Sequence, residues 1–291
     1  STTNNTNTGT SSSTNTTNTT NTSQQAWNSL LTKKKYGQQI AMELQTSYID
    51  MMNKIYYTKY KYYILNCQKL EKSKISLNKY DLLAVNVKET GGLFTKSKTA
   101  EQLVDIFKLH QRHVLLNNIS QANYIMYHIE EKKASKYTYQ ELFHSQLQLL
   151  RELTISEYDF IVQFFHPKTT TDEKTTEKIQ QQEQQPLKNS KEIFQAIFSK
   201  TFDFFQSYIG QQIDQSYDLI NMLLMIRILA YHYQEIQKEE IHASCLTFFF
   251  NGLNIKLWTK FKQLFDNHYQ SLKNYKKLTK LPLNTPIHFL I

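Results

Sequence analysis

The chain has 291 residues, 40% of them hydrophobic, which is enough for one large domain or two small ones with a buried core. Six Gly and four Pro are few, and no Gly falls in the G-x-G or G-x-x-x-x-G-K spacing that wraps a phosphate. Dinucleotide-binding and P-loop folds are therefore not expected. With only Cys67 and Cys245, the sequence predicts no disulfide framework and no four-cysteine zinc site, which favours a reducing, cytosolic compartment.

The formal net charge of +9 is concentrated in two stretches. Residues 33–79 hold ten Lys against three acids, and residues 256–280 hold seven Lys against one acid. Only three Arg occur in the chain, although Arg is the residue suited to bidentate recognition of bases and phosphates. The charge pattern therefore favours loose contact with an anionic surface.

No segment of the sequence predicts a signal peptide or a membrane span. The chain does not open with a basic segment followed by an apolar run. The most apolar windows are Tyr217–Tyr233 and Ile241–Trp258, and both are interrupted by charged or polar residues. Neither provides the roughly 20 apolar residues that cross a bilayer.

The N-terminal part predicts a tail followed by a long helix. Residues 1–23 contain only Ser, Thr and Asn apart from Gly9, so they have no apolar surface to bury and predict a disordered tail. From Gln38 to Thr90 the chain has no Gly or Pro, and apolar residues recur every three or four positions, which predicts a helix over about 26–70. The residues expected to form its core-facing stripe are Ile40, Leu44, Tyr48, Met51, Ile55, Tyr62 and Leu65.

The middle of the chain is mixed and then returns to helix. Residues 80–137 predict a short helix capped at Thr99 and an extended stretch around 113–129. Thr138 and Glu141 have the spacing of a capping box, in which each residue accepts a backbone N–H of the other. A helix of about 28 residues is expected to begin there and to end before Pro167.

The remaining segments predict two more long helices. Residues 166–190 are rich in Thr, Gln, Lys and Glu and predict a flexible linker. A third helix is expected to be capped by Asn189 or Ser190 and to continue past Gly210 to Tyr231, and a fourth to cover 238–276. The interpretation is an all-α protein, an elongated rod of long antiparallel helices over 24–276, with an irregular tail at 277–291.

The polar residues do not suggest an enzyme, a metal site or a cofactor site. His110 and His113 are three residues apart, but no third ligand lies near them in sequence. No G-x-S-x-G elbow occurs, and Cys245 lies on an apolar stripe that favours the core. The other candidates read as helix-interface or surface residues: His232, His242 and His268, and the adjacent acid pairs Glu130–Glu131 and Glu239–Glu240.

Two further features have both a functional and a structural interpretation. Residues 56–63 interleave Tyr with Lys. This pattern is typical of a stacking platform for nucleic acid, and also of a helix that packs against partners on more than one side. Arg227 stands among apolar residues and needs a carboxylate or carbonyl partner if its helix is enclosed. For both, the structural interpretation is favoured.

Read in order, several strings resemble one family. They are Tyr36–Ile40, Gly92–Lys96, Ile106–Leu109 with Arg112, and then Tyr137–Gln146 with Glu157–Ile161, and further on Leu257–Trp258 with Phe261. These strings are similar to the C-terminal half of the vacuolar protein sorting-associated protein 52 family. The resemblance covers about residues 34–273 in consistent order.

The resemblance implies a non-enzymatic subunit of the GARP and EARP vesicle-tethering complexes and a helical-rod fold. Its implied partners are the other tether subunits, SNAREs and Rab-type GTPases. It implies peripheral contact with Golgi or endosomal membrane, on the cytosolic face of the trans-Golgi network and endosomes. No contact residue follows from it. The family also carries an N-terminal coiled coil and a further C-terminal bundle that do not match this sequence, so the resemblance implies either a partial protein or an imperfect gene model.

An alternative function does not depend on the resemblance. A basic helical protein with exposed Lys would bind anionic membrane surfaces or nucleic acid, and its affinity would fall steeply with salt. Replacing Lys54, Lys59 and Lys61 separates this alternative from the tethering interpretation.

Overall fold

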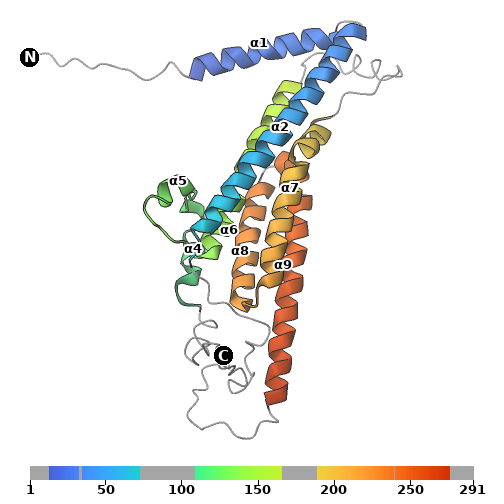
Figure 1. Cartoon of the computed structure of the whole chain (residues 1–291). Helices are drawn as coiled ribbons and strands as arrows, with labels where there is room; N and C mark the ends of the chain where they lie inside the picture. Colours follow the sequence, from blue (N-terminus) through green and yellow to red (C-terminus); the bar gives the residue numbers. More distant parts are fainter. Residues whose placement is uncertain (1–12, 33–34, 73–108, 166–188, 239, 276–291) are drawn as a thin grey trace, which may run out of the picture. The chain divides into compact units, whose positions relative to one another are not determined.

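The computed structural model describes residues 13–32, 35–72, 109–165, 189–238 and 240–275. In these ranges the chain is helical and forms no strand, which confirms the all-α prediction. The rod shape stays a prediction. The elements (Figure 1) are α1 (Ser13–Thr32), α2 (Lys35–Lys69), η1 (His110–His113), α4 (Val114–Asn117), η2 (Ile119–Gln121), α5 (Tyr127–Glu130), α6 (Tyr139–Phe165), α7 (Ser190–Gln215), α8 (Leu219–Gln237) and α9 (Glu240–Tyr275).

Two helix starts are confirmed where local capping chemistry predicts them. Before α6, the Glu141 carboxylate accepts the Thr138 N–H at 2.7 Å, and Thr138 Oγ1 accepts the Glu141 N–H at 3.3 Å. Before α7, Asn189 and Glu192 make the same reciprocal pair at 2.9 and 3.0 Å. Each box satisfies backbone donors that a helix start leaves without intrahelical partners.

The predicted single helix from 189 to Tyr231 is wrong. α7 ends at Gln215, and α8 begins at Leu219 with Asp218 as its N-cap. The Asp218 carboxylate accepts the Asn221 N–H at 2.9 Å, so the side chain replaces a helical backbone bond at this point. The apolar periodicity continues across the break, which is why the pattern did not show it. The fourth helix is confirmed as α9.

Other predictions differ from the structure or lie outside the described residues. α1 begins at Ser13, inside the tail predicted over 1–23, and α1 and α2 stand where one helix over 26–70 was expected. Around 113–129 the chain forms short helices as far as Gln121 and again from Tyr127, and only residues 122–126 between them are non-helical, so most of the predicted extended stretch is wrong. Residues 1–12, the Thr99 helix, most of the linker at 166–190 and the tail at 277–291 lie outside the described residues.

The predicted core stripe of α2 is also wrong. Six of its seven members are exposed, and Tyr48 is half-buried. The opposite side of the helix is buried although it includes polar Gln45 and Asn53. Asn53 Nδ2 donates to the Ala196 and Ile197 carbonyls at 2.8 and 2.9 Å, which satisfies its buried amide. The buried residues of α2 include Ala41, Gln45, Ile49, Asn53, Tyr60, Ile64 and Cys67.

The chain divides into two compact units. The first comprises the described parts of 1–61 and 152–202, and the second those of 62–151 and 203–291. In the first unit, Trp27 is buried against Phe165, with ring centroids 4.9 Å apart. Tyr56 of the same unit stacks on Phe198 at 4.7 Å. Aromatic contacts of this kind join α1, α2, α6 and α7 in the first unit.

The second unit has an aromatic core and a short backbone bridge. Phe205 of α7 stacks on Phe249 of α9 with ring centroids 6.0 Å apart. The backbone N–H groups of Lys72 and Tyr137 each donate to a carbonyl across the bridge at 2.9 Å. α8 and α9 lie side by side (Figure 1). Within the described ranges, no helix combines the length and the apolar character that a bilayer span requires.

Candidate functional site

Among its described residues, the first unit buries the carboxylate of Glu157 on α6. Tyr48 donates its hydroxyl to Glu157 Oε1, and Tyr56 donates to Oε2 at 2.7 Å. Burial raises the pKa of Glu157, while the two hydrogen bonds act in the opposite direction. Burial also raises the pKa of both tyrosines. This group of three residues, the Glu157 centre, joins α2 to α6 within the first unit.

The Tyr and Lys residues of 56–63 do not share one face. Tyr60 is buried, whereas Tyr62 is exposed. The Lys61 Nζ lies over the Tyr57 ring, 5.4 Å from its centroid. Tyr63 shares a 2.7 Å hydrogen bond with Ser145 in the second unit. These rings therefore fit the interpretation of a helix packed on more than one side better than that of a continuous stacking platform.

The second unit buries a pair of imidazoles. His144 on α6 and His232 on α8 are 2% and 0% exposed, and His232 Nε2 lies 3.0 Å from His144 Nδ1. Their ring centroids are 4.9 Å apart. Burial lowers the pKa of His144 to about 4 and that of His232 well below its usual value. Both rings are therefore neutral at pH 7, and an N–H of one ring donates a hydrogen bond to the bare nitrogen of the other.

Only His232 of this pair was singled out in the sequence. His144 lies 88 positions away, in the middle of α6, and nothing local distinguishes it from a core position. Among the residues that the structure describes, no group of three or more His, Cys, Asp or Glu gathers for a metal ion. The His144–His232 pair therefore reads as a buried contact between α6 and α8.

Other sequence candidates are scattered. His113 is half-buried in η1, and His268 is buried on α9, where burial lowers its pKa. Arg227 is exposed on α8, so it needs no buried partner there. The side chains of His110, His242 and Glu240, and all of Glu239, lie outside the described residues.

The two cysteines are both buried, and they form no disulfide with each other. Cys67 lies in a cluster with Leu70, Ile125 and Leu142, and burial raises the pKa of its thiol to about 11. The reactive thiolate is therefore disfavoured there. Cys245 is 8% exposed, in agreement with a core residue.

The acid pair Glu130–Glu131 serves the turn that follows α5. Tyr137 donates its hydroxyl to Glu130 at 2.6 Å, and Lys133 donates to it at 2.9 Å. The hydrogen bond from Tyr137, followed by those from Ser135 and Lys133, lowers the pKa of Glu130 to about 2. Glu131 is exposed, so the two carboxylates do not share a cleft.

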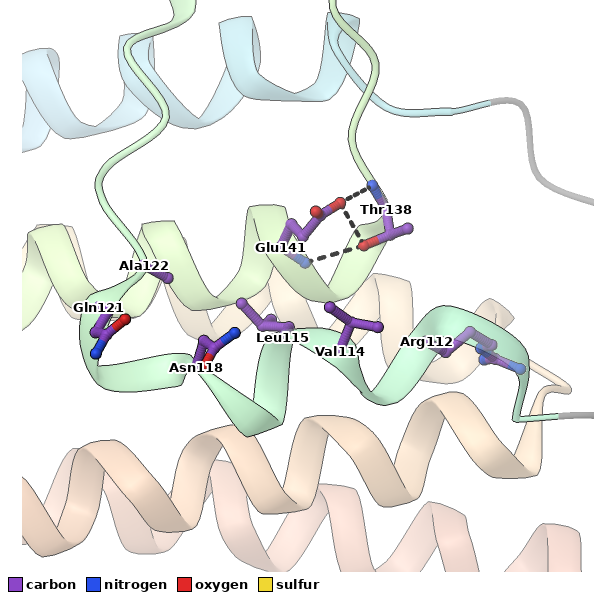
Figure 2. A pocket seen from close by; sticks show the side chains of 8 residues that line it. All are labelled: Arg112, Val114, Leu115, Asn118, Gln121, Ala122, Thr138 and Glu141. Atoms are coloured by element: carbon purple, nitrogen blue, oxygen red, sulfur yellow. Dashed lines mark hydrogen bonds between the residues drawn. The ribbon is translucent and has the colours of Figure 1, made fainter.

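A hollow of about 330 Å³ lies between residues 112–122 and the start of α6 (Figure 2). Figure 2 shows Glu141 and Thr138 turned toward each other on one wall, where they form the capping box. Arg112, on another part of the wall, makes a 2.6 Å ion pair with Asp218. The charged side chains that line the hollow therefore hold α6, η1 and the start of α8 in place. They do not form a nucleophile with a neighbouring base. The remaining lining residues are Val114, Leu115, Asn118, Gln121 and Ala122.

Comparison with models of known protein families identifies the family of this chain. Residues 50–289 match the family model described as Vps52, C-terminal. The chain belongs to this family. The resemblance read from the sequence strings is therefore confirmed, although no string by itself establishes it.

Relatives from plants, yeast and animals agree. The chain is 30% identical over 243 residues to vacuolar protein sorting-associated protein 52 A of Arabidopsis thaliana, which covers 83% of this chain and 30% of that protein. The chain is 26% identical to vacuolar protein sorting-associated protein 52 of Schizosaccharomyces pombe, and the alignment covers 82% of this chain and 42% of that protein. The chain is 22% identical to the Homo sapiens homolog, and the alignment covers 86% of this chain and 32% of that protein. The chain thus spans between 30% and 42% of the length of these relatives. No solved structure matches it.

Proposed function

We propose that this chain is part of a non-enzymatic subunit of a GARP- or EARP-like vesicle-tethering complex. The observation that carries the proposal is the family match over residues 50–289, together with relatives that are named for vacuolar protein sorting. The Glu157 centre, the His144–His232 pair and the Arg112–Asp218 ion pair are consistent with the proposal, because each joins one helix to another. The proposed process is retrograde transport from endosomes to the trans-Golgi network, with endocytic recycling as a second route.

The proposed mechanism is mechanical. Helices hold separate binding surfaces for other tether subunits, for SNAREs and for Rab-type GTPases, and affinity comes from apolar helix faces. The chain offers such faces, since α2 and α9 expose large apolar side chains. Its proposed location is the cytosolic face of the trans-Golgi network and endosomes, as a peripheral protein.

The test is affinity purification of the protein tagged at its own locus, with quantitative mass spectrometry. We expect the other tether subunits at near-equal amounts, and the set of subunits recovered will distinguish a GARP-like from an EARP-like complex. An untagged strain and a strain with the same tag on an unrelated cytosolic protein are the controls. Recovery of the tagged protein without any tether subunit would overturn the proposal.

A second candidate function is direct binding to anionic membranes. Lys54 and Lys59 are exposed on α2, next to the exposed apolar residues of that helix. A Lys near an anionic leaflet contributes about 1 kcal/mol of attraction, so several together give measurable binding.

Flotation with phosphatidylserine-containing vesicles tests this candidate. The variant with Lys54, Lys59 and Lys61 all changed to Glu should lose binding, and wild-type binding should fall as salt rises. The matched control changes Lys132, Lys191 and Lys200, which are also exposed, to Glu. Equal binding of both variants and wild type would remove the candidate and leave the tethering proposal unaffected.

A further inference from the structure

Helix α9 has two apolar faces, and the described residues of the second unit cover only one. The covered face packs on α7 and α8, through contacts such as Phe249 with Phe205 and Phe250 with Tyr233. On the opposite side, Phe248 is 87% and Ile255 67% exposed. A helix that is apolar on two sides is normally enclosed on both. The covered residues are Leu246, Phe249, Phe250, Leu253, Leu257, Leu264 and His268.

The exposed side of α9 follows a heptad. Its positions are separated alternately by three and four residues, as in the a and d positions of a coiled coil. An amphipathic helix that only covers a globular core shows a broader stripe, whereas this spacing describes a narrow line suited to one partner helix. We call these residues the α9 seam: Phe248, Asn251, Ile255, Trp258, Lys262, Phe265 and Tyr269, all of them exposed.

The seam is rich in large rings, which suits it to docking. Trp258, Phe265 and Tyr269 are each about half exposed. The Trp258 ring contacts the Phe261 ring, with centroids 5.6 Å apart, and Phe261 stacks on Phe265 at 6.3 Å. Aromatic side chains lose little conformational entropy on binding, and they dominate the affinity of protein interfaces.

The charge on the seam indicates which helix would cover it. The exposed charged residues along this part of α9 are Lys256, Lys262 and Lys273, against Asp266. Lys262 occupies a core position of the heptad, where burial requires an opposite charge. A parallel second copy would place Lys262 against Lys262, and any second copy would bring two basic helices together. Charge complementarity therefore favours an acidic partner.

We propose that the α9 seam docks one amphipathic helix of another protein, with a heptad of apolar residues and an Asp or Glu facing Lys262. The inference deepens the proposed function and rests on it for the identity of the partner, which would be another tether subunit. Asn251, the other polar position of the seam, would fix the register of the two helices.

The test places a photo-crosslinking amino acid at Ile255 in the complete protein, expressed in its own cells. We expect an adduct with a different protein, at a peptide that is helical, apolar every three or four residues and acidic. The matched control has the same amino acid at Gln263, which is exposed on another side of α9. An adduct with a second copy, an adduct within the same chain, or no difference between the two positions would each overturn the proposal.

Charge reversal provides an independent readout. We expect Lys262→Glu to reduce the Ile255 adduct about tenfold, because it brings two acids together in a desolvated position, and Gln263→Glu to leave it unchanged. Reversing the acid at the crosslinked position of the partner to Lys should restore the adduct in the Lys262→Glu variant. Both changes are at exposed positions, so the helical content and melting temperature should match those of the wild type.

The two proposals fail separately. If purification recovers the tether subunits but the seam crosslinks to none of them, the docking inference is wrong and the tethering function stands. If the seam captures an acidic helix of a protein unrelated to tethering and purification recovers no tether subunit, the docking chemistry is correct and the proposed function is wrong.

Discussion

Both units bury titratable side chains in the core, but the first buries an acid and the second buries two bases. The first unit buries the Glu157 carboxylate under two tyrosine hydroxyls, and the second buries the His144–His232 pair. Burial penalises the charged form in both, so it raises the pKa of Glu157 and lowers the pKa of the two histidines. The same physical cause therefore gives the two units opposite responses to pH.

The largest expected effect comes from removing one imidazole. His232→Ala leaves a cavity beside His144 and removes the ring that shares its hydrogen bond, so we expect a loss of about 4 kcal/mol in the free energy of unfolding. Urea denaturation followed by circular dichroism measures it. Arg227→Ala, at an exposed position of the same helix, should change stability by less than about 0.5 kcal/mol. Similar values for the two variants would show that the pair contributes nothing specific.

The next effect is the acid response of the second unit. The folded-state pKa of His144 is about 4, below the ordinary value of 6.5, so the unfolded chain binds more protons between these values and stability falls as the pH falls through this window. Because one pKa unit corresponds to about 1.4 kcal/mol, the loss reaches about 3 kcal/mol at pH 4, and His232 adds to it in the same direction.

Hydrogen exchange at pH 6.5 and pH 4.5 measures this response, with corrections for the intrinsic rate. Protection of α8 should fall in acid more than that of residues 190–202 of α7, which belong to the first unit. The double variant with His144 and His232 both changed to Phe should lose this acid response, because no titrating ring remains at the site. An acid response that survives in that variant would contradict the assignment to the pair.

The smallest expected effect is the opposite response of the first unit. The pKa of Glu157 is raised in the folded state, so its contribution is most favourable at low pH and is lost as the pH rises from the ordinary value of 4.5 through the raised one. Glu157→Gln keeps a hydrogen-bonding group between Tyr48 and Tyr56 but cannot ionise. We expect it to remove this dependence and to change stability at pH 7 by about 1 kcal/mol or less.

Exchange rates of α2 residues near Tyr56, measured between pH 4 and pH 7, check this prediction. The wild type should lose protection as the pH rises, and Glu157→Gln should not. Asp50→Asn, which removes a carboxylate at an exposed position of α2, is the control for the loss of charge alone. If Glu157→Gln and wild type have the same pH profile, the two units do not differ in the way that the buried groups predict.

The amino-acid sequence by itself determined the features that depend on near neighbours. The starts of α6 and α7 follow from Thr138 with Glu141 and from Asn189 with Glu192, because a capping box needs only residues three positions apart. The all-α class follows from helical periodicity with few Gly and Pro, and the family follows from short strings in a consistent order. The cap at Asp218 was not predicted, because unbroken apolar periodicity around it concealed the end of α7.

Only the tertiary structure decided which helix face is buried and which distant polar groups meet. α2 carries apolar residues on both sides, and the buried side is the one where Asn53 finds carbonyl acceptors on α7. The contact of His144 with His232 and that of Glu157 with Tyr48 join residues 88 and 109 positions apart. Hydrophobic periodicity gives the direction of each apolar stripe but not the neighbour that will cover it, so these choices require the packed structure.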